Sequence, residues 1–291
     1  MPVTRRAFLA ALAASPPGPY VENTTHMFSS DQATFPYHPL ATRRPPPLDV
    51  EKYNAFVKAS GLTHTVIVHS EAYQDDHRYL EYCFHHEPSP NYFKGTCLYD
   101  PTHPDTPRRI GDLAAKWPKR IVGMRIHEYR HASEPPTTAG PLRDRDLRSP
   151  AMKKTWLTLK DLGMVAQLQM VPSHAPQVAA LAKDTGTTVL LDHLALPARG
   201  TPAEYEGVIA LAKVPNVIMK ISSLSEKDKD LVKRLYDAYG PARLVWGSYG
   251  SSLASFQKNI ALSELIFDYA SEHERRQIRG GNALKLFGFA R

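Results

Sequence analysis

Side chains able to transfer a proton or bind a carboxylate stand at or just after the ends of short apolar runs along this 291-residue sequence. Histidine titrates near neutral pH, so it can accept a proton from water, and arginine can hold a carboxylate through paired hydrogen bonds. Hydrolysis of an ester or lactone needs such a base and a donor for the carbonyl oxygen. The residues concerned are His26, His69, Arg125, His127, Gln169, His193, Lys220, Ser222 and Tyr249.

The elements that must position these residues are β-rich runs at 20–23, 65–69, 95–99, 121–127, 165–170, 188–193, 217–222 and 244–248. Most are nearly continuous apolar runs, as expected of parallel strands buried on both faces. Helical patterns lie between them, which indicates repeated strand–helix units. An open doubly wound sheet would usually carry a glycine-rich phosphate loop after its first strand, and 20–23 is followed by none. The sequence therefore predicts an α/β fold, a single (β/α)8 TIM barrel over residues 19–291, with its site at the C-terminal ends of the strands.

Several motifs, in the right order, resemble the amidohydrolase-related family of the metal-dependent hydrolase superfamily. Residues 21–28 resemble the family's opening Asp-x-His-x-His stretch, with Thr24 in place of the first histidine. Residues 191–194 followed by Pro197 resemble its strand-six Asp-His motif, and 219–222 resemble its strand-seven Lys-x-Ser. Residues 246–249 are similar to its strand-eight Trp-Gly-Ser-Asp, with Tyr249 replacing the aspartate. The nearest branch contains the dicarboxylate-pyrone lactonases, which hydrolyse a lactone without needing a metal.

The resemblance also implies where a metal would bind. Metal-using members have two histidines after strand one, histidines on strands five and six, and an aspartate on strand eight. Of these ligands, the sequence retains His26 and His193. Because catalytic zinc usually takes three protein ligands, we predict no metal and no other cofactor. The alternative is a single zinc ion held by His26 and His193.

We predict His26, His193 and Tyr249 as the catalytic residues, with a histidine as the base. The residues predicted to bind the substrate are Arg125, Lys220, His69, His127, Gln169 and Ser222. Two of these have structural alternatives, since Arg125 could form an ion pair inside the barrel and Lys220 could be a buried partner of Asp192.

These residues predict a metal-independent hydrolase acting on a lactone or carboxylated ester. Two alternatives stay open: a decarboxylase or metal-assisted hydrolase on the same barrel, and a binding protein whose catalysis is impaired. The replacement of the expected histidine by Thr24 and of the expected aspartate by Tyr249 favours this last alternative. A screen of lactones and aryl esters separates a catalyst from a binder.

The overall charge of +7 is spread along the sequence, with basic residues often beside acidic ones, as at 143–146. This pattern argues against nucleic-acid binding and is compatible with an anionic small-molecule substrate. No apolar run reaches the length of about 18 residues that a membrane span needs, and homo-oligomerisation is left open. Residues 1–18 resemble a twin-arginine export signal or form a disordered tail. We therefore predict a periplasmic or exported protein if the signal functions, and a cytoplasmic one otherwise.

Overall fold

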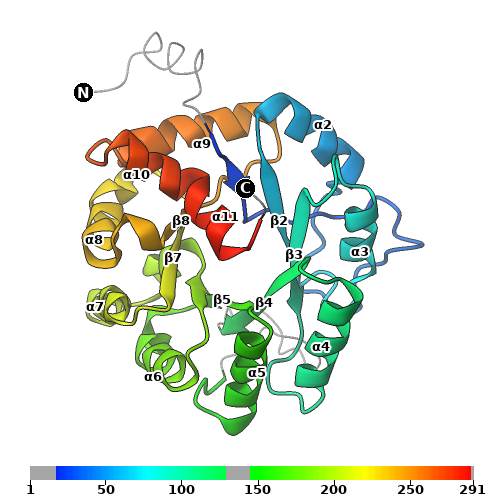
Figure 1. Ribbon diagram of the computed structural model, residues 1–291, viewed down its shortest axis with the longest axis horizontal. Helices are drawn as coiled ribbons and strands as arrows, with labels where there is room; N and C mark the ends of the chain where they lie inside the picture. Colours follow the sequence, from blue (N-terminus) through cyan, green and yellow to red (C-terminus); the bar gives the residue numbers. More distant parts are fainter. Residues whose placement is uncertain (1–17, 129–144, 290–291) are drawn as a thin grey trace.

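The computed structural model describes residues 18–128 and 145–289, so the predicted export signal lies outside the described residues except for Gly18. Within them, eight parallel strands pair in chain order, and helices form a ring outside the strands (Figure 1). The strands are Val21–Glu22 (β1), His64–Val68 (β2), Phe93–Leu98 (β3), Ile121–Glu128 (β4), Val165–Met170 (β5), Val189–Leu191 (β6), Val217–Ile221 (β7) and Leu244–Trp246 (β8). The prediction of a (β/α)8 barrel is confirmed, because each β-rich run overlaps one of these strands.

The helices follow the strands in alternation. They are Val50–Ser60 (α2), Arg78–His85 (α3), Thr106–Lys116 (α4), Pro150–Asp161 (α5), Ala175–Thr185 (α6), Pro202–Ala210 (α7), Lys229–Tyr239 (α8), Leu253–Ile266 (α9), Glu272–Arg276 (α10) and Asn282–Leu286 (α11). None of them, in the described part of the chain, combines the length and the apolarity needed to cross a bilayer.

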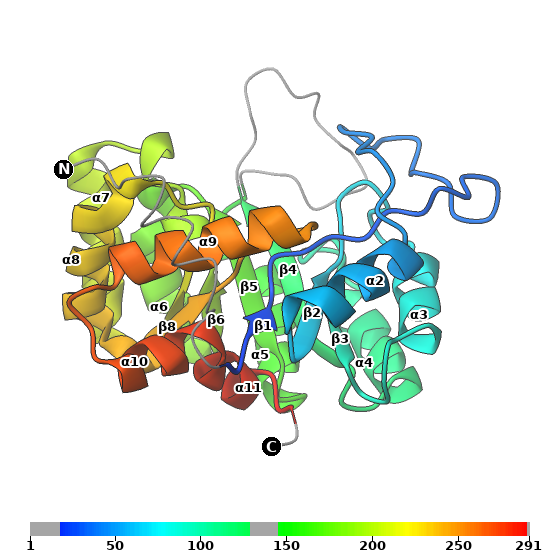
Figure 2. The ribbon, with the colours of Figure 1, turned by 90° about the horizontal axis from the view of Figure 1, so that it is seen from above.

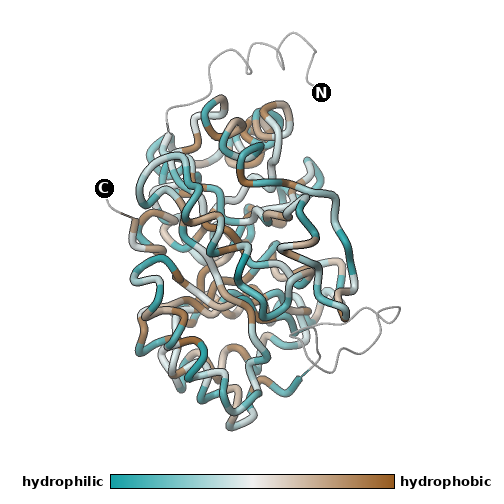
Figure 3. Tube along the Cα trace, turned by 90° about the vertical axis from the view of Figure 1, so that its right-hand side faces the viewer, coloured by the Kyte–Doolittle hydropathy of each residue, from teal (hydrophilic) through white to brown (hydrophobic). Residues whose placement is uncertain are grey.

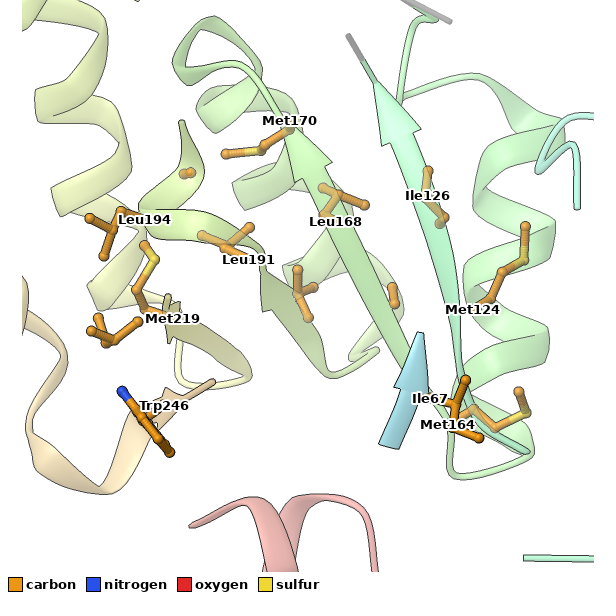
Figure 4. Packing of buried hydrophobic residues seen from close by; sticks show 14 of the residues in the cluster. Ile67, Met124, Ile126, Met164, Leu168, Met170, Leu191, Leu194, Met219 and Trp246 are labelled. Atoms are coloured by element: carbon orange, nitrogen blue, oxygen red, sulfur yellow. The ribbon is translucent and has the colours of Figure 1, made fainter. Parts of the chain in front are cut away.

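The alternation of side chains along each strand separates the core from the site. On β4, Met124 and Ile126 pack in the main hydrophobic core, whereas Arg125 and His127 line a cavity. Successive side chains of a strand point to opposite faces, so a single strand serves both purposes. Figure 4 shows the apolar side of β4 and its neighbours, including Leu168 and Met219. The trace in Figure 3 has its hydrophobic stretches mainly in the interior, with hydrophilic loops around them.

The two ends of the barrel differ in what covers them. At the N-terminal end, Phe287 and Phe289, just after α11, pack with Val21, Val66 and other strand residues in a second apolar cluster. Figure 2 shows α11 at this end and the long connection after β1 at the opposite end. That proline-rich connection is pinned by an antiparallel bridge between Phe28 and Leu48. The C-terminal segment therefore closes the N-terminal end of the barrel, and the polar residues lie at the C-terminal end of the strands.

Side chains bridge the seam between β8 and β1. The Asn23 amide donates to the carbonyl of Trp246 at 2.7 Å. The buried Glu22 carboxylate accepts bonds from the backbone amides of Thr24 at 2.7 Å and Ser248 at 3.0 Å, and from both of their hydroxyls. Residue 247 must be glycine here, because a Cβ at Gly247 would lie 2.6 Å from Cγ2 of Thr24.

Candidate active site

A cavity of about 230 Å³ opens at the C-terminal end of the barrel. Its described lining residues come from the ends of β4 and β5 and from the segments after β1, β2, β6 and β8. They are His26, Phe28, Thr42, Arg43, Pro45, Ser70, Glu71, Ala72, Arg125, His127, Gln169, His193 and Tyr249. Of the predicted site residues, the structure therefore brings His26, Arg125, His127, Gln169, His193 and Tyr249 together around one cavity.

Arg125 is the centre of this group and is almost fully buried. Its Nη1 lies 3.3 Å from Nε2 of His26, its Nη2 donates to Oε1 of Gln169, and its Nε lies 3.3 Å from a carboxylate oxygen of Asp192. A guanidinium carries five N–H donors in a rigid plane, so these contacts fix its orientation and leave further donors on the terminal nitrogens. Arg125 therefore forms the ion pair inside the barrel that was its structural alternative, and it also lines the cavity.

Asp192 follows β6 and forms ion pairs with Arg125 and Lys220. Its carboxylate lies 2.8 Å from Nζ of Lys220, and the Gln167 amide donates to both of its oxygens at 2.9 and 3.1 Å. Burial alone would raise the pKa of Asp192, but the charges of Lys220 and Arg125 hold it well below its usual value. Asp192 is therefore ionised at neutral pH and serves as the counter-ion of two buried cations.

The two predicted catalytic histidines differ in which nitrogen remains available. Because a guanidinium can only donate, His26 accepts from Arg125 with Nε2, and its Nδ1–H donates to the carbonyl of Val68 at 2.7 Å. His193 uses Nδ1 toward the hydroxyls of Ser222 at 2.9 Å and Ser223 at 3.3 Å, and no hydrogen bond among the described residues involves its Nε2.

Both of these histidines are neutral near pH 7. Burial and then the Arg125 charge lower the pKa of His26 to about 3. Burial lowers the pKa of His193 to about 4, with Asp192 opposing the shift and Arg125 adding to it. Burial also lowers the pKa of His127 well below its usual value. A neutral imidazole is the form that can accept a proton, so His193 has both the protonation state and the atom that a base needs.

An unusual backbone conformation holds His193 at the cavity. The four consecutive residues from His193 to Leu196 all have positive φ, between 52° and 57°. Non-glycine residues rarely adopt this left-handed region, and clusters of such strain are typical of functional sites. The phenol of Tyr205 donates to the carbonyl of Leu194 at 2.7 Å and supports the turn. The sequence carried no glycine or asparagine here that would have indicated this turn.

Tyr249 covers the histidine pair from the mouth of the barrel. Its ring stands edge-on to His26 at 6.3 Å and to His193 at 5.9 Å between centroids, and 53% of the residue is exposed. Its backbone is left-handed as well, with φ of 55°. Tyr249 therefore forms part of the cavity wall and is about half exposed to solvent.

Three residues predicted to bind substrate lie outside the cavity wall. Lys220 is fully buried, with Nζ on Asp192 and, at 2.6 Å, on the carbonyl of Asn23, so its structural alternative holds. His69 turns its Nε2 to the carbonyl of Gln74 at 2.8 Å and stacks on His77. Ser222 contacts His193 rather than the cavity. In each case another group of the same chain binds the polar atoms that were expected to contact a substrate.

Several lining residues that the sequence did not predict come from the connections after β1 and β2. The side chain of Glu71 accepts from the amide and hydroxyl of Thr42 at 2.9 and 3.1 Å, which ties the two connections together at the cavity rim. The exposed Arg43 follows directly. The only signal for them was the proline-rich stretch after His26, which indicated a loop over the mouth but no particular residues.

Comparison with known proteins places this barrel in a family. The sequence profile of the amidohydrolase family matches residues 26–289, so the chain belongs to the amidohydrolase family. This confirms the resemblance to that family and the expectation of a hydrolase-type enzyme. No curated protein matches the chain in a sequence search.

Solved structures share the fold. A Pseudomonas putida protein assigned as a 2-pyrone-4,6-dicarboxylic acid hydrolase has a TM-score of 0.73 and 20% identity, covering 94% of this chain and 98% of its own. An Acinetobacter baumannii protein with the same assignment, with citric acid bound, has a TM-score of 0.72 and 20% identity over 93% and 99% of the two chains. A dihydroxybenzoic acid decarboxylase from Polaromonas sp. JS666, with bound manganese and an inhibitor, has a TM-score of 0.66 and 13% identity over 94% and 98%.

The manganese in that relative raises the question of whether a metal fits this site. Among the described residues, no cluster of three or more His, Cys, Asp or Glu side chains is placed to bind one. Nε2 of His26 faces the guanidinium of Arg125, and the Asp192 carboxylate faces both Arg125 and Lys220. A divalent cation between His26 and Asp192 would meet two fixed positive charges, so these residues do not fit a metal ion.

Proposed function

We propose that the chain is a hydrolase of carboxylate-bearing lactones or esters that works without a metal, with His193 as its base. The observation that carries the proposal is the pairing of a neutral histidine, whose Nε2 takes no hydrogen bond from the described residues, with a buried arginine on the same cavity.

In this reaction Nε2 of His193 takes a proton from water as the water oxygen bonds to the carbonyl carbon. The carbonyl oxygen becomes an oxyanion, which the terminal N–H groups of Arg125 stabilise. The intermediate then collapses with cleavage of the carbon–oxygen bond, and the leaving oxygen takes the proton back from His193. The products of a lactone are a hydroxyl and a carboxylic acid on one molecule, and the acid then releases its proton to solvent and becomes a carboxylate.

His26, Gln169 and Asp192 then serve as positioning residues. Each contacts a different nitrogen of Arg125, so together they hold the guanidinium plane. Fixed donors of this kind need no reorganisation during the reaction, which is the main source of their catalytic effect.

The charges around the cavity support an anionic substrate. The ionised side chains on its described wall are Arg43, Arg125 and Glu71, and the Glu71 carboxylate is occupied by Thr42. Because His26 and His193 are neutral, they do not change the charge of the described wall, which is net positive. The citric acid bound by the Acinetobacter baumannii relative is a carboxylate ligand of the same kind. We expect Arg43 at the rim to attract the substrate carboxylate.

The test is a panel of 2-pyrone-4,6-dicarboxylate, aliphatic lactones with and without a carboxylate, and aryl esters, assayed before and after dialysis against a chelator. We expect hydrolysis of the carboxylate-bearing members, unchanged by the chelator. His193→Gln should lower kcat by about 10²- to 10⁴-fold, the usual contribution of a general base. Arg43→Gln should mainly raise KM. His273→Gln, at an exposed histidine of α10, is the matched control.

The outcomes separate the alternatives. Activity that disappears with the chelator and returns with zinc or manganese would support a metal-assisted hydrolase. Release of carbon dioxide from an aromatic acid, without ester cleavage, would support a decarboxylase. Tight binding of the same anions with no turnover would indicate a binding protein.

A further inference from the structure

A second cavity of about 320 Å³ lies beside the first and shares Tyr249 with it. Its wall is built from the segment after β7, the end of β8 and the inner side of α9. The lining residues used below are Ser223, Leu224, Trp246, Tyr249, Asn259 and Leu262. Because one side chain belongs to both walls, the two cavities are neighbours and Tyr249 stands between them.

A second contact links the two cavities. The hydroxyl of Ser223, in the wall of the second cavity, lies 3.3 Å from Nδ1 of His193, in the wall of the first. A group bound in the second cavity would therefore lie next to the proposed base. That is where the alcohol part of an ester would be found while its acyl part occupies the first cavity.

The chemistry of the two walls differs. The first cavity has ionised arginines and a glutamate, whereas every described residue of the second is uncharged. Leu224 and Leu262 are half-buried and offer apolar surface, and Trp246 closes the base. The Asn259 amide nitrogen is occupied by the carbonyl of Ser248, which leaves its oxygen as an acceptor. The wall thus combines the apolar side chains of Leu224 and Leu262 with polar atoms of residues such as Ser223 and Asn259, so it suits a neutral group.

We propose that the second cavity is a subsite for the neutral alcohol portion of the substrate, so that the enzyme acts on esters or substituted lactones with an anionic acyl part and a neutral alcohol part. This inference rests on the proposed function and makes its substrate class more specific. Tyr249 sets the boundary between the anionic and the neutral part.

The experiment measures binding and turnover separately. N-alkyl succinamates, with alkyl groups from methyl to hexyl, are titrated by calorimetry, and the corresponding monoalkyl succinate esters are assayed for hydrolysis. Each methylene that enters the subsite should tighten binding by about fourfold until the cavity is full. Leu262→Trp, which fills the cavity from α9, should remove most of this gain. Lys258→Trp, at an exposed position of the same helix, should keep it.

Leu224→Trp fills the subsite from the opposite wall and keeps the test valid if Leu262→Trp does not fold. Affinity that does not rise with chain length in the unmodified protein, including a failure to bind the series, overturns the subsite. The same gain in a folded filling variant also overturns it. Binding that depends on chain length without hydrolysis of any ester sinks the proposed hydrolase function and leaves the subsite standing.

Discussion

The backbone amide of Tyr249 donates a hydrogen bond of 2.9 Å to the hydroxyl of Thr24. Two of the positions at which the sequence departs from the family's motifs therefore touch each other across the seam between β8 and β1. The same hydroxyl donates to the carboxylate of Glu22. Thr24 is thus part of a closed hydrogen-bond network, and its replacement of the expected histidine leaves no gap in the barrel.

We expect Thr24→Val to destabilise the protein by about 1–3 kcal/mol, because the isosteric change removes an acceptor and a donor from a buried network. Urea unfolding of the two proteins measures the difference. Thr158→Val, which loses a hydroxyl bonded to a backbone carbonyl within α5, is the control and should change stability by about 0.5 kcal/mol or less. Equal stability of Thr24→Val and the parent protein would show that the seam does not depend on this network.

The role of Tyr249 can be tested by two substitutions that should affect activity differently. Aspartate tolerates the left-handed backbone of this position better than tyrosine does, and it is ionised at pH 7. We expect Tyr249→Asp to raise kcat on a small lactone by about tenfold or more, because it adds a base at the mouth. Tyr249→Phe should keep the activity, since the ring rather than the hydroxyl forms the wall. Activity lost in both variants would mean that the phenol itself is the working group.

The pH dependence of turnover should report the neutral state of His193. Since burial lowers its pKa to about 4, kcat/KM should stay level as the pH falls from 7 to 5 and decline only near pH 4. The decline should be absent from the residual activity of His193→Gln. A decline centred near pH 6.5, the value of an unperturbed histidine, would show that a solvent-exposed group acts as the base.

Stability should also fall on acidification, over a higher pH range. His26 and His193 have folded-state pKa values lowered to about 3 and about 4, whereas in the unfolded chain each titrates near its usual value of 6.5. The unfolded state therefore binds protons first, so stability is fully present above about pH 6.5 and is lost as the pH falls toward 4. Asp192, whose pKa is also lowered, adds a loss of the same sign at more acidic pH.

Urea unfolding at pH 7, 6 and 5 measures this loss of stability. The double variant His26→Gln/His193→Gln should show a shallower dependence between pH 7 and 5 than the parent protein does. His85→Gln/His273→Gln, which changes two exposed histidines, should leave the dependence as it is. An unchanged slope in the first double variant would contradict the assignment of these histidines as buried neutral groups.

The barrel itself was determined by the sequence. Eight apolar runs and the helical patterns between them require parallel strand–helix units, and polar residues at the strand ends gather at one face once the barrel forms. For that reason the sequence alone assigns His26, Arg125, His193 and Tyr249 to one end of the barrel, where they line one cavity. The succession of strands and helices along the chain and the alternation of side chains within a strand are local properties, and a single sequence contains them.

Only the tertiary structure decided what each polar group does. Lys220 and His69 lie near the C-terminal ends of their strands, as Arg125 and His193 do, yet their charged or polar atoms are taken by Asp192 and by the carbonyl of Gln74. The left-handed turn that begins at His193 and the second cavity behind Tyr249 also depend on contacts between segments far apart in the chain. A pattern of residues can place a side chain at the mouth of a barrel. The groups that it contacts there come from other strands and loops, and the spacing of residues along the chain does not specify the distances between those segments.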